Sequence, residues 1–140
     1  MVMVLDCSVT AAWIFEEKED IAYSDAVLDE LGGDGIAFVP VNWFSEIANT
    51  IAMSERRKRY TAAERSKFLQ SLTALPIEVD EEASLRLVSR LLALASEYRL
   101  TAYDAAYLEL AMRKGLPLAT LDKDLRRAAK LAGVELVAEK

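Results

Sequence analysis

Short, mostly apolar runs alternate with longer amphipathic segments along the chain. The short runs have the length and composition of buried strands and lie at residues 1–5, 36–39, 76–79, 116–120 and 134–137. Between them, apolar side chains recur with helical spacing at residues 8–15, 20–31, 41–54, 61–73, 81–98, 101–114 and 123–132. Strands that alternate with helices predict a parallel sheet with helices on both faces.

The predicted helix boundaries carry capping signals. We expect Ser8 to cap the first helix, and Thr61 with Glu64 forms a capping-box pattern. Thr101 opens a helix that ends at Gly115. No linker, repeat or low-complexity stretch interrupts the order, so we predict one α/β domain over residues 1–140, with a mostly parallel sheet of four to five strands. Ligands of such sheets bind at the carboxyl ends of the strands.

The composition is that of an ordinary soluble protein, with 53% hydrophobic and 29% charged residues. No apolar run reaches the ~20 residues of a membrane span, and no signal-peptide pattern precedes the first strand. We therefore expect a cytoplasmic protein with no membrane partner. The single cysteine, Cys7, excludes an internal disulfide and is interpreted as a small core residue rather than a reactive thiol.

The chain contains no histidine. This excludes Ser-His-Asp and Cys-His nucleophilic systems, His-ligated zinc and general acid–base catalysis by imidazole. The remaining ligands are mainly carboxylates and hydroxyls, which favour hard cations such as Mg²⁺ or Mn²⁺.

Charge is unevenly distributed, although the net charge is −6. Residues 16–34 hold eight acids against one base, and residues 56–67 hold six bases against one acid. A second basic zone consists of Arg113, Lys114, Lys123, Arg126, Arg127 and Lys130. Such clusters fit phosphate binding and fit solvated helix faces equally well, so charge alone does not decide between them.

Four acids follow strands or begin helices. Asp6 ends the first predicted strand and Asp122 follows the fourth, which places both at the edge where ligands bind. Glu46 lies among apolar residues in the helix after the second strand. Asp104 lies in the first turn of the helix that Thr101 opens. These four acids can therefore converge on one cleft.

Each acid also has a purely structural interpretation. Asp104 and Asp122 could cap their helices or favour the helix dipole, which is worth about 0.5–1 kcal/mol. Asp6 and Glu46 are harder to explain in this way, because buried carboxylates cost stability unless they are paired or bound to metal. Neighbouring carboxylates repel by up to about 4 kcal/mol per close pair at an effective dielectric near 20, and a divalent cation relieves that repulsion. We interpret the four together as a metal-binding cluster.

Four short segments resemble the motifs of PIN domains and, more narrowly, of the VapC toxins of bacterial toxin–antitoxin pairs. They are VLDCS at residues 4–8, SEIAN at 45–49, TAYDAAY at 101–107 and TLD at 120–122. The resemblance runs end to end and includes LRRAAKLAGV at residues 125–134. Four motifs in order at compatible spacing form a specific signal.

The resemblance implies a Mg²⁺- or Mn²⁺-dependent endoribonuclease with a three-layer α/β/α fold. Its catalytic, metal-binding acids would be Asp6, Glu46, Asp104 and Asp122. Ser8 and Thr120 match positions where the family often has a hydroxyl, in the second shell of the metal. Asp124 could bind a second ion or only cap its helix. The resemblance also implies an RNA substrate, with tRNA as one candidate, a homodimer, and an antitoxin segment across the cleft.

The expected reaction is hydrolysis of RNA by metal-activated water, since the chain offers no convincing nucleophile for a covalent intermediate. In this interpretation Arg56, Arg57 and Arg59 bind substrate phosphates. Tyr60 could stack on an unpaired base or pack in the core.

Other classes fit less well. A haloacid-dehalogenase phosphatase needs an aspartate two residues after Asp6, where Ser8 stands. A response-regulator receiver needs paired acids and a late lysine that are not suitably placed here. The remaining alternative is a non-catalytic dimerising or regulatory module on a degenerate nuclease fold, against which the intact acids argue.

Overall fold

The computed structural model describes residues 1–15 and 18–139, so two members of the acidic run, Glu16 and Glu17, lie outside the described residues. The elements follow the predicted alternation. They are β1 (Val2–Leu5), α1 (Cys7–Phe15), α2 (Lys18–Leu31), β2 (Ile36–Pro40), α3 (Asn42–Arg56), α4 (Ala62–Thr73), β3 (Ile77–Asp80), α5 (Leu85–Tyr98), α6 (Ala102–Lys114), β4 (Leu118–Ala119) and α7 (Lys123–Ala132).

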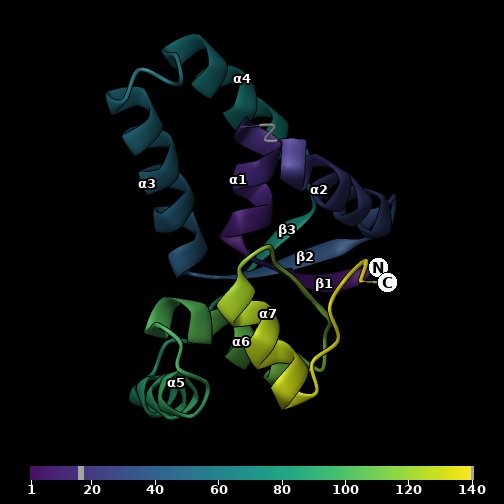
Figure 1. The fold of residues 1–140 in the computed structure, drawn as a ribbon, viewed down its shortest axis with the longest axis vertical. Coiled ribbons are helices and arrows are strands. Elements are labelled where there is room, and N and C mark those ends of the chain that lie inside the picture. Colours follow the sequence, from purple (N-terminus) through teal and green to yellow (C-terminus); the bar gives the residue numbers. More distant parts are fainter. Residues whose placement is uncertain (16–17, 140) are drawn as a thin grey trace.

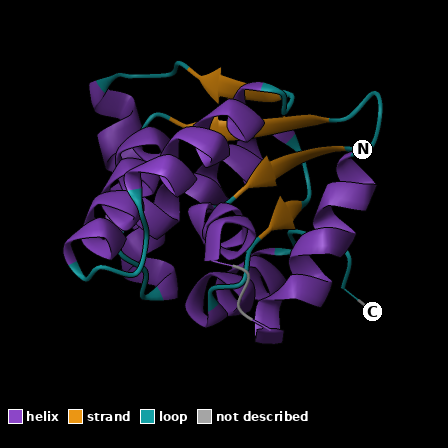
Figure 2. Ribbon diagram, turned by 90° about the horizontal axis from the view of Figure 1, so that it is seen from above, coloured by secondary structure: helices purple, strands orange, loops and turns teal. Residues whose placement is uncertain are grey.

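Within the described part of the chain, the strands form an all-parallel sheet in the order β3-β2-β1-β4. Helices α1 to α4 lie on one side of the sheet and α5 to α7 on the other, as Figure 1 shows. This confirms the predicted α/β class with helices on both faces. Figure 2 shows the strands side by side with their carboxyl ends at one edge, which is where the candidate site lies.

The predicted fifth strand, residues 134–137, is reduced to one isolated bridge between Leu118 and Leu136. The backbone of Leu118 donates to Glu135 and accepts from Val137. No longer ladder can form there because β4 itself has only two residues, and Thr120 already leaves the sheet toward α7.

The core is centred on β1 and α6. Met3, Val4 and Leu5 are fully buried in β1, and α6 is buried from Ala105 to Ala111. Helix α6 contacts three of the strands and also both α5 and α7. Because α6 carries Asp104 and Tyr107 near its start, this packing fixes the position of both side chains against the end of β1.

Most predicted caps are confirmed, whereas the starts of α1, α2 and α5 differ from the prediction, with α2 beginning at Lys18 and not at residue 20. Thr61 and Glu64 form the capping box of α4. Helix α1 begins at Cys7, so Ser8 lies in its first turn and is not its cap. Helix α5 begins at Leu85, after the cap Ser84, and not at residue 81.

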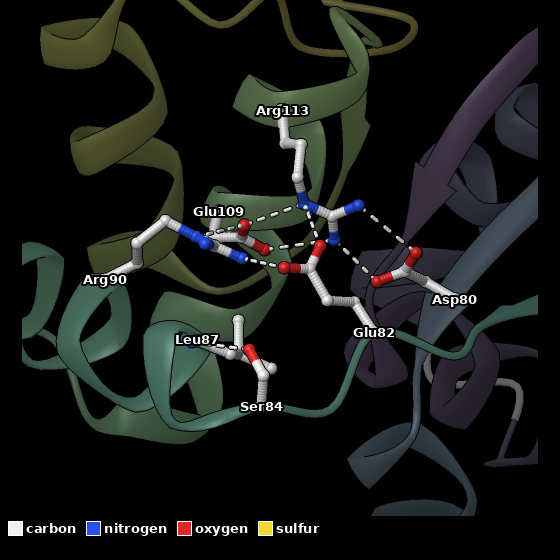
Figure 3. Close-up of polar contacts among 7 residues, drawn as sticks. All are labelled: Asp80, Glu82, Ser84, Leu87, Arg90, Glu109 and Arg113. Carbon is white, nitrogen blue, oxygen red and sulfur yellow. Dashed lines mark hydrogen bonds and ion pairs between the residues drawn. The ribbon is translucent and has the colours of Figure 1, made fainter.

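A charged cluster on α5 and α6 explains the later start of α5 (Figure 3). The buried Glu109 accepts hydrogen bonds from Arg90 at 3.0 Å and from Arg113 at 2.8 Å. Glu82 also forms ion pairs with both arginines, and Arg113 reaches Asp80 at the end of β3. Residue 82 is thereby held outside the helix, and the cluster ties α5, α6 and β3 together.

No described helix is long and apolar enough to cross a membrane.

Candidate active site

Asp6 lies directly after β1 and is only 3% exposed. Its Oδ2 atom accepts hydrogen bonds from the hydroxyls of Ser8 and Thr120, each at 2.6 Å. The Ser8 hydroxyl in turn accepts from the Leu121 amide at 2.9 Å, and the Thr120 hydroxyl accepts from the Asp122 amide at 3.0 Å. The two hydroxyls therefore connect the end of β1 to the segment after β4 and hold Asp6 in one orientation.

Glu46 lies one turn into α3 and points toward α6. Its Oε1 atom accepts hydrogen bonds from the Asn42 side-chain amide at 2.6 Å and from the Tyr107 hydroxyl at 3.0 Å. Tyr107 is fully buried, so its phenol fixes Glu46 from the core side. The sequence-based hypothesis missed both donors. Asn42, four residues before Glu46, and Tyr107, three residues after Asp104, each carried a helical-spacing signal.

Asp104 and Asp122 begin α6 and α7, and only one of them serves as a cap. The Asp104 amide donates to the Thr101 hydroxyl at 3.1 Å, so Thr101 caps α6 and the Asp104 carboxylate is not needed for that task. Asp122 is the N-cap of α7, because its Oδ1 atom accepts from the Leu125 amide at 2.8 Å. The capping alternative therefore describes Asp122 but not Asp104. One oxygen of Asp122 is left over by this bond.

The two acids held by side-chain donors share a pattern. In Asp6 both donors reach Oδ2, and in Glu46 both donors reach Oε1. Among the described residues, nothing donates to the second carboxylate oxygen of either. Each side chain is thus fixed through one oxygen and presents the other to a ligand or to water.

The acids lie close enough to shift one another's titration. Burial raises the pKa of Asp6 to about 6, and repulsion from Glu46 and Asp122 adds to this, against the opposing hydrogen bonds from Ser8 and Thr120.

Burial likewise raises the pKa of Asp104 to about 6, with further repulsion from Asp122, Asp6 and Asp124. Burial also raises the pKa of Glu46, and repulsion from Asp104 adds to it. Asp6, Glu46 and Asp104 thus share one electrostatic environment in which negative charge is costly, and the Asp122 carboxylate contributes to it through its repulsion of Asp6 and Asp104.

The donor set suits a hard divalent cation, because it consists of carboxylate oxygens under mutual repulsion. Within the described residues, however, no three such side chains are gathered tightly enough to complete a cage. An ion would be held by one or two carboxylates, with water and substrate oxygens as further ligands, which is the usual arrangement for Mg²⁺. The residues fit such an ion.

Asp124 and Cys7 are less suited to this chemistry. Asp124 points to the surface of α7 and pairs with Arg127 at 2.8 Å. Cys7 is buried, and burial raises the pKa of its thiol to about 12, with repulsion from Asp6 adding to the effect. A thiol with such a pKa stays protonated at neutral pH, which agrees with a core role.

The first basic zone lies away from the acids. Arg56 ends α3, and Arg57 and Arg59 lie in the turn toward α4. This turn is at the end of the α3–α4 pair that lies away from the sheet (Figure 1). From Glu46 to Arg56 the helix rises about 15 Å at 1.5 Å per residue. All three arginines are exposed and form no ion pair with any described residue.

Tyr60 and the second basic zone are largely engaged in contacts within the protein. Tyr60 packs edge-to-face on Phe15 at a centroid distance of 5.6 Å, which is the core alternative. In the second basic zone, several cations are engaged in ion pairs with acids of the described chain. They are Arg113, Arg126, Arg127 and Lys130. That zone therefore offers less free positive charge than its sequence suggested.

Solved structures and one family model resemble this chain. No curated protein matches the chain in sequence. Among solved structures, PAE2754 from Pyrobaculum aerophilum is 24% identical, with a TM-score of 0.70 over 98% of this chain and 90% of that one. A toxin–antitoxin complex from Klebsiella pneumoniae contains a chain that is 19% identical, with a TM-score of 0.63 over 99% of both chains. The PIN domain model matches residues 3–131, and the chain therefore belongs to the PIN domain family.

Proposed function

We propose that this protein is a metal-dependent endoribonuclease that hydrolyses RNA phosphodiester bonds with an activated water molecule. PIN domains are generally nucleases and generally use divalent metals. The observation that carries the proposal is the group of four acids at the end of β1, in α3, in α6 and before α7, in which burial and neighbouring carboxylates raise the pKa of Asp6, Glu46 and Asp104. Folding tolerates such a group at a cost, and cation binding is the function that uses it.

In the proposed reaction the acids have separate tasks. Asp6 and Glu46 each offer one oxygen that is fixed in direction by donors on the other oxygen. Asp104 and the second oxygen of Asp122 complete the anionic surface. When bound, a divalent cation supplies activation of the attacking water and neutralisation of charge on the phosphate. Ser8 and Thr120 orient Asp6, and Asn42 and Tyr107 orient Glu46.

Substrate binding needs positive charge outside the acidic centre. We propose that Arg56, Arg57 and Arg59 bind RNA phosphates, because they are exposed and have no acidic partner among the described residues. Arg56 lies about 15 Å along α3 from Glu46, and Arg57 and Arg59 follow it in the turn, so the three would contact the RNA some nucleotides away from the bond that is cut.

We further propose that the protein is the toxin of a VapBC-type pair, a cytoplasmic homodimer that a cognate antitoxin inhibits. The resemblance in fold to a chain of the Klebsiella toxin–antitoxin complex supports this. Helix α5 also leaves Leu85, Val88 and Leu92 exposed at helical spacing, a surface suited to a protein contact. Light scattering of the purified protein, alone and with the product of the adjacent gene, tests both assemblies.

Cleavage assays test the enzymatic proposal. Wild-type protein should cut RNA from a randomised pool in Mg²⁺ or Mn²⁺ and should stop when EDTA is added. Asp6→Asn should remove cleavage. Asp29→Asn, an equivalent change at an exposed position on α2, should retain it. Equal cleavage in EDTA, or full activity of Asp6→Asn, would refute the proposal. Absence of cleavage by the wild type in both Mg²⁺ and Mn²⁺ would favour the non-catalytic alternative.

A further inference from the structure

A pocket of about 440 Å³ opens beside the acids, between α3 and the start of α6. Helix α3 contributes Ser45, Glu46 and Asn49, and the start of α6 contributes Tyr103 and Asp104. Its volume lies within the ~300–1,000 Å³ of small-ligand sites. Two of its lining residues, Glu46 and Asp104, also belong to the acidic group. An occupant of this pocket would therefore lie next to the reacting phosphate.

The side of α3 that lines the pocket carries polar residues. Ser45 and Asn49 are exposed and lie one turn apart, on the side of α3 that lines the pocket. The opposite side carries the buried Trp43, Ile47 and Ile51. Core packing accounts for the apolar side only, so the hydroxyl and the amide of the polar side remain available to a ligand.

Tyr103 adds an aromatic group to the pocket. It is 66% exposed, although it lies on a helix whose next residues are buried from Ala105 onward. Its backbone carbonyl accepts from the side chain of Asn42 at 3.5 Å, a contact that does not involve the ring. A large aromatic ring left in solvent beside a pocket is a suitable stacking surface.

The charge of the pocket indicates what can enter it. Among the described lining residues there are two carboxylates and no lysine or arginine. The two carboxylates belong to the proposed cation site, and the rest of the described lining has no positive charge to bind a second phosphate. A nucleobase, in contrast, is neutral, flat and bears hydrogen-bonding groups at its edge. We propose that this pocket binds one nucleobase of the RNA, adjacent to the bond that is cut. Tyr103 would stack on the base, and Ser45 and Asn49 would hydrogen-bond to its edge. This inference rests on the proposed ribonuclease function.

The test combines variants of the protein with a modified substrate. One RNA that the wild type cleaves is made again with an abasic nucleotide at each position flanking the cut. An abasic site keeps the ribose and phosphate and removes only the base. At one of these positions kcat/KM should fall about 5- to 140-fold for the wild type, the equivalent of ~1–3 kcal/mol for one stacked base.

Tyr103→Ala should lower kcat/KM on the intact RNA by a similar factor, mainly through KM. On the RNA that is abasic at that position, it should lower kcat/KM little further, because the contact is already lost. Tyr103→Phe should retain most of the wild-type value, since the ring remains. Leu131→Ala, at a 70% exposed position near the end of α7, is the matched control and should leave kcat/KM unchanged on both substrates.

The outcomes are separable. The inference would be overturned if Tyr103→Ala and the abasic nucleotide lowered kcat/KM independently, so that their effects multiplied. It would also be overturned if Tyr103→Ala cleaved intact RNA with the kcat/KM of the wild type. If the wild type itself cuts no RNA in Mg²⁺ or Mn²⁺, the proposed function fails, which is a different result.

Discussion

Replacing Asp6 by asparagine should separate the stability of the fold from its function. The asparagine keeps the shape of the side chain, and its carbonyl oxygen can still accept from Ser8 and Thr120. It removes one negative charge from a position that is 3% exposed and repelled by Glu46 and Asp122. Without metal, the variant should therefore be at least as stable as the wild type.

The magnitude follows from the pKa of Asp6. Burial, with repulsion from neighbouring acids, raises this pKa from 3.8 to about 6. The shift of about two pH units corresponds to about 3 kcal/mol of lost stability when the side chain is ionised. Because the folded pKa is raised, this cost is fully present above pH 6 and disappears below about pH 4, where Asp6 is protonated in both states.

Part of that gain is offset in the variant. The asparagine NH₂ group replaces an oxygen that has no donor among the described residues, and burying an NH₂ group without an acceptor costs about 1 kcal/mol. The net gain at pH 7.5 in EDTA is then about 2 kcal/mol, or roughly 6 °C in Tm for a chain of this length. At pH 4.5 the difference between the two proteins should largely vanish.

Thermal melts with and without Mn²⁺ complete the test. At a Mn²⁺ concentration 100-fold above its Kd, wild-type protein should gain about 2.7 kcal/mol, whereas Asp6→Asn should gain little. The exposed variant Asp29→Asn should behave as the wild type in both buffers. If Asp6→Asn were less stable than the wild type in EDTA and still responded to Mn²⁺, Asp6 would be a structural residue and the reasoning would be wrong.

Two further changes test the neighbouring groups. Replacing Arg56, Arg57 and Arg59 by glutamine should reduce the slope of log binding constant against log salt concentration for single-stranded RNA by about 2, at ~0.7 per lost phosphate contact. The affinity for Mn²⁺ should not change. An unaltered slope in filter binding would show that the three arginines form only a solvated surface. Tyr107→Phe should lower kcat about tenfold, because Glu46 loses one of its two orienting donors and a mispositioned group is costly, and cleavage kinetics with wild-type kcat would contradict that role.

The sequence predicted the fold well wherever short-range rules apply. Helical spacing and the caps at Thr61 and Thr101 depend on residues within one turn, and these predictions are confirmed. The start of α5 was predicted too early because the local cap Ser84 was missed and because Glu82 pairs with Arg90 and Arg113 outside the helix. Ion pairs between elements leave no periodic signal.

The candidate site shows the same division. Asp6 and Asp122 could be assigned to one edge because the carboxyl ends of parallel strands must meet there. Asn42 could have been found as a donor to Glu46, because it lies four residues earlier on the same helix. The bond from Tyr107 could not be assigned, since it depends on how α6 packs against α3, across 61 residues of sequence. In the sequence Tyr107 resembles an ordinary core aromatic residue, and only its hydroxyl makes it part of the site.

The hydrogen-bond donors to Asp6 and Glu46 affect the pH range in which the site can work. Burial pushes the pKa of Asp6 upward, and the hydrogen bonds from Ser8 and Thr120 oppose that push. Without them the carboxyl would stay protonated closer to neutral pH and would lose its attraction for a cation. Asn42 and Tyr107 oppose the same effect at Glu46. By acting on one oxygen only, the four donors oppose the rise in the pKa of each acid and still leave its other oxygen available.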